Sequence, residues 1–382
     1  MKILLIGEYN SCHYGLKEAL TSLGHNVTVI GHGDGFKNRT VDIRYNIKYT
    51  SGISFYIKRI LYRLFKIDIT SNSIYNQVWK IKDTLTGYDI VQLINESPFN
   101  ASAKIEKRLL KFVFENNKNI YLLSCGTDYV SVKYAFDKKF KYSILTPYFD
   151  GKGTEKEFWH ATKYITTSYK KLHDYVYSHI NGVIASDLDY HIPLKNHEKY
   201  LGLAPNLIDT GLIKYIKPDV SNKIIIFHGI NRNNYFKKGN DIFEKALELI
   251  ASKYSDKVEI ITVENLPYKD YIKSYDMAHI LLDQVYAYDQ GFNALEAMAK
   301  GKVVFTGAEK EWLDYHNLIP DTVAINAEPN ANRIAEKLEW LILNPQKILE
   351  ISRNARAYIE ANHDHIKAAK IYLDMWRKAA AI

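Results

Sequence analysis

Cysteine and long apolar runs are scarce in this sequence of 382 residues. It contains two cysteines, Cys12 and Cys125, which excludes a disulfide framework or a four-cysteine zinc site and is typical of a reducing compartment. Uncharged apolar runs such as 224–227 fall far short of the roughly 18 residues that a membrane-spanning helix needs. The N-terminal segment turns polar too early for a secretory signal. We therefore expect a soluble cytoplasmic protein with two free thiols.

Sequence patterns for redox and metal chemistry are also missing. The loop 7–13 lacks the glycine-rich fingerprint of dinucleotide-binding proteins, which argues against a nicotinamide enzyme. The 13 histidines show no zinc-protease or other metal spacing, and the stretch 363–365 favours a helix cap over a ligand pair. We expect no required metal and no cofactor.

The net charge of +8 is unevenly distributed along the chain. Residues 1–200 hold 28 Lys and Arg against 19 Asp and Glu, so the positive excess lies in the N-terminal half. Such an excess suits lipid headgroups, a phosphorylated acceptor or nucleic acid, and a well-solvated surface explains it equally well. Because no nucleic-acid recognition motif accompanies it, we expect no nucleic-acid partner.

Apolar runs alternate with stretches of helical periodicity. Strand 2–6, helix 16–23 and strand 27–30 form a βαβ unit, whose near-continuous apolar strands indicate a parallel sheet covered on both faces. The first series continues with strands 90–94, 120–124, 164–167 and 182–184 and a helix over 103–115. The second series has strands 223–229, 258–261, 280–282, 303–305 and 323–325, and helices 241–252, 268–276 and 294–299.

This alternation and the chain length predict an α/β protein with two Rossmann-like doubly wound domains. We place an N-terminal domain at 1–204, a linker at 205–222 that begins at a proline, and a C-terminal domain at 223–382. The last helix, 366–378, can pack in its own domain or cross back to the first. Open α/β folds bind ligands at the carboxyl ends of their strands. Function is therefore expected in the cleft between the domains.

The clearest functional pattern is the turn Gly291, Phe292 and Asn293, which leads into a helix containing Glu296. A turn of this kind presents free N–H groups and the positive end of the helix dipole to an anion. A carboxylate early in the helix can accept hydrogen bonds from vicinal sugar hydroxyls. The segment predicts a site for phosphate and ribose, with an ordinary amphipathic helix as the alternative.

A basic loop leaves the strand 223–229 and carries Asn231, Arg232 and Lys238. Its two cations can converge on a phosphate held at the Gly291 turn. One charge-assisted hydrogen bond contributes about 1.5 to 3 kcal/mol. A lone basic loop is more often a solvated turn, so the prediction depends on the pairing with Gly291.

These motifs resemble those of GT-B glycosyltransferases of the family-4 type. The stretch 205–209 is similar to the family's P-N-G-V-D linker, 228–239 to its G-R-x-x-x-x-K-G phosphate loop, and 296–304 to its E-A-M-A-x-G-x-P-V core. The resemblance implies transfer of a sugar from a UDP- or GDP-sugar to a glycan or glycolipid, with retained anomeric configuration and no metal. It implies a nucleotide-sugar site in the C-terminal domain and an acceptor side in the N-terminal domain.

By the same resemblance, Arg232 and Lys238 would neutralise the donor diphosphate and Glu296 would bind its ribose. The expected donor site is completed by Asn231, Asp283, Gly291, Phe292 and Asn293. The residues 283–284 resemble a variation of one bacterial surface-glycan subgroup.

The chain departs from this family where a donor-sugar carboxylate is expected. Tyr288 stands at the first glutamate of the family's E-x7-E pair. Asp283, Asp289 or Gln290 can take its place. A sugar-nucleotide epimerase and a non-catalytic nucleotide- or glycan-binding protein share the two-domain layout, and both stay open as alternatives.

Three residues of the first domain are candidates for the acceptor side. Asp128 follows a strand where the family carries a histidine or aspartate facing the acceptor, and Glu8 and His13 lie on the first loop. Each can orient the acceptor hydroxyl or take its proton, and each can equally be a helix cap. The D-x-D pattern at 187–189, which metal-dependent glycosyltransferases of another fold use, is interpreted as a surface turn.

The segment 55–67 is basic and amphipathic. Apolar residues at helical spacing share one face, and Lys58, Arg59, Arg63 and Lys66 lie largely on another. A helix of this kind can lie on an anionic membrane or pack its apolar face on the domain's own sheet. If the helix lies on the membrane, we expect a lipid-linked acceptor at the inner face of the cell membrane. The protein would then be peripheral to that membrane.

Overall fold

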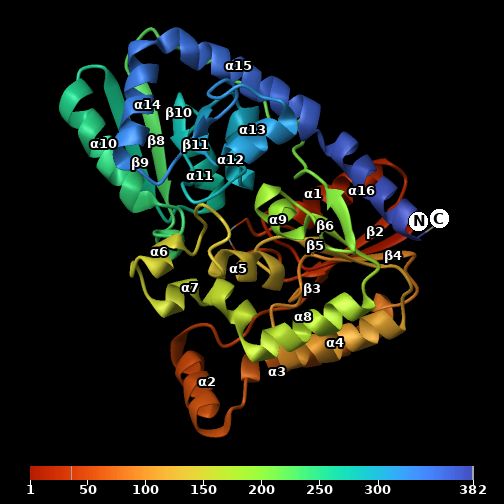
Figure 1. Cartoon of the computed structure of the whole chain (residues 1–382). Coiled ribbons are helices and arrows are strands. Elements are labelled where there is room, and N and C mark those ends of the chain that lie inside the picture. The colour runs from red at the N-terminus through yellow and green to blue at the C-terminus, as the bar shows by residue number, and fades with distance from the viewer. Residues whose placement is uncertain (36, 381–382) are drawn as a thin grey trace.

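The computed structural model describes residues 1–35 and 37–380, which form two parallel β-sheets flanked by helices (Figure 1). The larger sheet has seven strands in the order β3 (Ile43–Arg44), β2 (Asn26–Gly31), β1 (Lys2–Ile6), β4 (Ile90–Leu93), β5 (Ile120–Ser124), β6 (Gly182–Ala185) and β7 (Tyr200–Leu203). The smaller sheet has the order β12 (Ile325–Asn326), β11 (Val303–Thr306), β10 (Ile280–Leu282), β8 (Ile224–Ile230) and β9 (Val258–Glu264). The order 3-2-1-4-5-6 is that of a Rossmann-like sheet, so the predicted α/β class is confirmed.

We use "first lobe" for the seven-stranded sheet with the helices around it, and "second lobe" for the five-stranded sheet with its helices. The first-lobe helices are α1 (Cys12–Ser22), α2 (Gly52–Phe65), α3 (Ile69–Trp79), α4 (Ala103–Glu115), α5 (Tyr129–Phe136), α6 (Thr146–Phe149), α7 (Glu155–Thr162), α8 (Thr167–His179) and α9 (Leu188–Leu194), with short 3-10 turns η1 (Lys82–Leu85) and η2 (Lys163–Ile165). The second lobe has η3 (Arg232–Asn234), α10 (Asn240–Tyr254), α11 (Tyr268–Ser274), α12 (Phe292–Ala299), α13 (Lys310–His316), α14 (Ala331–Leu343) and α15 (Pro345–Asn362).

The central strands of the first lobe, β1, β4, β5 and β6, are almost entirely buried on both faces because helices cover each side. Successive residues of a strand point to opposite faces. Leu4 and Ile6 accordingly join one buried cluster, which includes residues of α4 and α8, while Ile3 and Leu5 join another. The near-continuous apolar strands seen in the sequence have this physical origin.

The last helix, α16 (His365–Ala380), lies on the first lobe. Tyr372 and Trp376 are buried against Leu5 and Leu16, and the Tyr121 hydroxyl donates to the Trp376 carbonyl at 2.9 Å. The chain therefore passes between the lobes twice. At the second crossing Ile208 pairs with Asp364 as an isolated parallel bridge.

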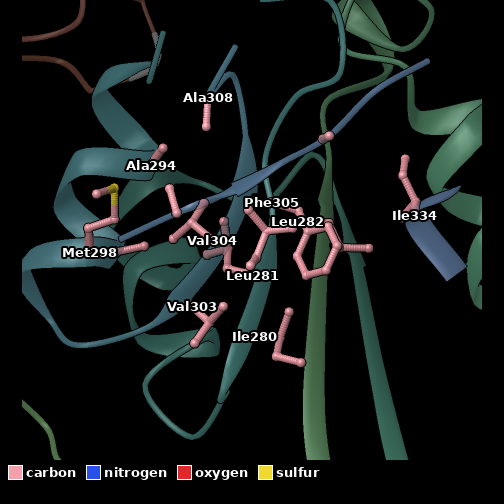
Figure 2. Close-up of a cluster of buried hydrophobic side chains, with 14 of the residues drawn as sticks. Ile280, Leu281, Leu282, Ala294, Met298, Val303, Val304, Phe305, Ala308 and Ile334 are labelled. Carbon is pink, nitrogen blue, oxygen red and sulfur yellow. The ribbon is translucent and has the colours of Figure 1, made fainter. Parts of the chain in front are cut away.

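The second lobe has its own core, in which β10 and β11 pack against α12. Figure 2 shows side chains of these strands, such as Leu281 and Val304, gathered between Met298 of α12 and Ile334 of α14. All four side chains are essentially inaccessible. Burial of this core holds α12, and with it the Gly291 turn, at a fixed place beside the sheet.

One predicted strand is wrong. The segment 164–167 forms η2 and the first turn of α8 instead of a strand. Its β-branched residues favour a strand locally, but Tyr164 packs with Leu145 and Phe158 in a small helical cluster. This tertiary packing decides the conformation.

The described residues contain no helix that combines the length and apolar character needed to cross a bilayer.

Candidate functional site

A cavity of about 210 Å³ lies between the two lobes. First-lobe loops that follow β1, β5 and β6 line one side of it, including Cys12, Gly126 and Asp187. The segment that follows β10 lines the other side, including Asp289 and Gly291. The cavity therefore lies at the carboxyl ends of strands from both sheets, where α/β folds bind their ligands.

The helix α12 begins at this cavity. Gly291 precedes it in an extended conformation, and its backbone approaches the side chain of Asp283, whose Oδ2 would lie 3.6 Å from a Cβ at Gly291. Phe292 and Asn293 form the first turn, and Phe292 also lines the cavity. The structure thus places the predicted anion-binding turn at the cleft.

Glu296 is buried one turn further into α12. Its carboxylate accepts hydrogen bonds from Tyr268 Oη at 2.6 Å and from Lys37 Nζ at 3.1 Å, and Arg39 lies 3.9 Å away. Lys37 and Arg39 belong to the first lobe. The carboxylate predicted to bind ribose is therefore held by cations from across the cleft.

Lys238 reaches the same end of α12. Its Nζ lies 2.8 Å from Asp283 Oδ1, and Asp283 is the residue beside Gly291. The loop that carries Lys238 requires a glycine at position 239, where φ is 72° and an added Cβ would lie 2.6 Å from Val285. A side chain at 239 would therefore clash with the segment that follows β10.

Arg232 points elsewhere. Its guanidinium forms a bidentate pair with Glu264 at the end of the edge strand β9, with Nε 2.8 Å from Oε2, and this pairing raises the pKa of Arg232. Asn231 caps the short η3 turn by accepting from the Asn233 N–H at 3.0 Å. The structure does not bring Arg232 together with Lys238, since β9 lies on the opposite side of β8 from β10.

Two residues that can replace the missing carboxylate for the donor sugar lie in the cavity wall. Asp289 is buried, which raises its pKa to about 6, and its Oδ2 accepts from the first-lobe Leu188 N–H at 3.1 Å. Gln290 donates to the Gly307 carbonyl at 2.7 Å, while its Oε1 has no hydrogen-bond partner among the described residues. An unpaired buried acceptor at a cavity is suited to a hydroxyl group of a ligand.

The D-x-D stretch is not the surface turn expected from the sequence. Asp187 and Asp189 line the cavity at the start of α9, and both Oδ atoms of Asp189 lie 3.2 Å from the Tyr288 N–H of the second lobe. Burial, followed by the charge of Asp289, raises the pKa of Asp189 to about 7. Packing of the second lobe over α9 partly buries a motif that would be more exposed in an isolated first domain.

Glu8 is buried in the loop that follows β1. Burial raises its pKa to about 8, although the Tyr14 N–H donates to Oε2 at 2.6 Å. Its Oε1 has no partner among the described residues. A carboxyl group in this state is largely protonated at neutral pH and can exchange a proton near pH 8.

His13 and Asp128 have structural partners. His13 is fully buried, and its Nδ1 lies 2.8 Å from the Gly7 carbonyl, which can only accept, so Nδ1 carries the proton. Burial lowers the pKa of His13 to about 3. Asp128 caps α5 by accepting from the Ser131 N–H at 2.8 Å, and the Ser124 hydroxyl donates to its other oxygen. The alternative of a helix cap is the one that the structure shows for Asp128.

The sequence offered no sign of the first-lobe cations at Glu296. Lys37 and Glu296 are separated by 259 residues, and Lys37 belongs to no recognisable motif. The two cysteines also meet at the cavity, with their Sγ atoms 3.7 Å apart.

In the described chain no group of three or more His, Cys, Asp and Glu side chains is arranged to hold a metal ion.

Comparison with known proteins identifies the fold. No protein-family model matches the chain, and no curated protein matches it. Sucrose-phosphate synthase from Thermosynechococcus elongatus superposes with a TM-score of 0.63 at 14% identity, over 100% of both chains. The chain has the GT-B fold. Anabaena HepE in complex with UDP and glucose superposes with a TM-score of 0.62 at 14% identity, over 100% of both chains. A glycosyltransferase from Rickettsia africae gives 0.52 at 16% identity, over 99% of this chain and 98% of that one.

Proposed function

We propose that the protein is a glycosyltransferase that transfers a sugar from a UDP- or GDP-sugar to a glycan or glycolipid of the bacterial surface. The observation that carries this proposal is the buried Glu296 on a helix whose glycine-led start faces the inter-lobe cavity, with Lys238 beside that start. The same fold occurs in HepE, which has been solved with UDP-glucose, and that complex matches this chain with a TM-score of 0.57 at 12% identity.

In this proposal the donor nucleotide binds the second lobe. Its diphosphate lies at the start of α12, where the free N–H groups and Lys238 stabilise its negative charge, and Glu296 accepts from the ribose hydroxyls. Lys238 would exchange Asp283 for phosphate, because the two anions compete for one ammonium. Arg232 would have to leave Glu264 to take part. Their pair is half-exposed, so the cost of separating it is small.

The sugar of the donor would occupy the cavity. Asp289 and the free Oε1 of Gln290 supply acceptors for the sugar hydroxyls. They replace the glutamate that the resemblance implies at the position of Tyr288. Asp187 and Asp189 face the same space from the first lobe. A site lined with acceptors is suited to a ligand that carries several hydroxyl donors.

For the chemical step we propose a metal-independent displacement with retention. The leaving diphosphate accepts the charge that develops when the glycosidic bond breaks, and α12 and Lys238 stabilise it. The acceptor hydroxyl attacks on the same face of the sugar that the diphosphate leaves, which retains the configuration, and its proton passes to Glu8 with help from the leaving phosphate. Asp128 positions the loop after β5, which lines the cavity through Gly126 and Thr127.

We also propose that α2 binds an anionic membrane surface and brings the protein to a lipid-linked acceptor. None of the residues of α2 is buried, and Ile53 and Leu64 are 80% and 67% exposed. Figure 1 shows this helix standing apart from the others of the first lobe. An exposed apolar face beside Lys58, Arg59, Arg63 and Lys66 suits a surface of anionic lipid.

The experiment that tests the donor site is nucleotide binding by calorimetry. We expect Lys238→Ala and Glu296→Ala to weaken binding of UDP or GDP at least tenfold, because each removes a charged partner of the nucleotide. Lys245→Ala and Glu248→Ala, which make the same changes on exposed positions of α10, serve as matched controls. Folded variants that bind both nucleotides as tightly as the parent protein would show that the donor site is elsewhere.

A further inference from the structure

A loop of the first lobe reaches across the cleft into the second lobe. It follows β2 and carries Lys37, whose side chain is 1% exposed. Besides its ion pair with Glu296, Lys37 Nζ lies 3.8 Å from the ring centroid of Phe292 and 4.8 Å from that of Tyr268. The ammonium group is therefore enclosed by one carboxylate and two aromatic faces, all of them from the second lobe.

Lys37 and Lys238 approach the start of α12 along two routes. Lys37 lies over the ring of Phe292, the first residue of the helix. Lys238 pairs with Asp283, whose side chain lies beside the backbone of Gly291 in space. Arg232, by contrast, is paired with Glu264 on the far edge of the sheet. These two cations near the helix start thus come from different lobes.

We propose that Lys37 is the second cation that binds the donor diphosphate, in the place that sequence resemblance gives to Arg232. This inference rests on the proposed donor site. When ribose hydroxyls hydrogen-bond to Glu296, they compete with Lys37 for its oxygens. A buried ammonium that loses part of its anionic partner is unstable unless another anion replaces it, and the diphosphate at Gly291 and Phe292 is the anion that arrives.

The position of Lys37 also connects donor binding to lobe closure. The lysine belongs to the first lobe and the diphosphate would bind the second, so one phosphate contact holds both lobes. Arg39 supports the same loop, since its Nε donates to Ser11 Oγ at 2.7 Å and its Nη2 lies 3.4 Å from Tyr268 Oη. The nucleotide would therefore tighten the cleft around the sugar.

The test compares a nucleoside diphosphate with its own monophosphate and nucleoside by calorimetry on the full chain. The probe is whichever of UDP, GDP, CDP and dTDP binds the parent protein most tightly. Lys37→Met keeps a long apolar side chain between the two rings while it removes the charge, and Lys37→Arg keeps the charge. Lys48→Met makes the same change at an exposed position of the same lobe.

We expect Lys37→Met to weaken binding of the nucleoside diphosphate about tenfold to a hundredfold, as the loss of one charge-assisted contact predicts. Lys37→Met should bind the nucleoside as tightly as the parent protein does. Lys37→Arg and Lys48→Met should bind the nucleoside diphosphate with a Kd within about threefold of the parent value. Unchanged diphosphate binding by Lys37→Met would overturn the inference. Equal weakening of diphosphate and nucleoside would also overturn it, because it would mean that Lys37 only positions Glu296. Failure of the parent protein to bind any of the four nucleotides would instead contradict the proposed function.

Discussion

At the scale of single residues, the proposed role of Glu8 as the base depends on its protonation state. Because burial raises its pKa to about 8, the carboxylate that acts as a base becomes available only as the pH rises. We expect kcat/KM to increase about tenfold per pH unit below 8 and to level off above it. Glu8→Gln keeps an acceptor for the Tyr14 N–H and should lower kcat roughly 10² to 10⁴-fold with the donor Kd unchanged. The exposed Glu18→Gln on α1 is the control. A parent-like pH profile in Glu8→Gln would assign the proton to another group.

At the scale of elements, α2 is a helix whose apolar face is largely exposed in the described part of the protein. We expect the protein to float with vesicles of anionic lipid, to stay at the bottom with neutral vesicles, and to dissociate as salt screens the attraction. Changing Lys58, Arg59, Arg63 and Lys66 to Glu should abolish flotation. The exposed α16 residues Lys367, Lys370, Arg377 and Lys378 changed to Glu provide a control of equal charge. Flotation that survives the α2 changes, or that both sets remove equally, would mean that α2 is not the contact.

At the scale of the whole molecule, carboxyl groups at the junction of the lobes make stability depend on pH. The pKa of Asp189 rises to about 7 in the folded chain from an unfolded value near 3.9, so the folded state binds this proton more tightly. Its contribution to stability is complete below pH ~4 and is lost as the pH rises through about 7. Asp189→Asn cannot ionise and still accepts from the Tyr288 N–H. We expect its Tm to exceed that of the parent by a few degrees at pH 8 and to match it near pH 4. The exposed Asp174→Asn should show no such trend, and a Tm difference for Asp189→Asn that does not change with pH would contradict the assignment.

Most of the fold and part of the site could be predicted from the sequence, because those features depend on local patterns. Apolar runs predict most of the buried parallel strands, and the glycine turn before α12 predicts where a helix begins at the cleft. The destination of α16, the burial of 187–189 and the helical conformation of 164–167 depend on contacts between distant segments. No local pattern contains that information. The same holds for the charges of the site: sequence spacing suggested Arg232 beside Lys238, whereas the packing of the two lobes places Lys37 beside Glu296. Local propensity thus determines the elements, and long-range packing decides which of their side chains meet.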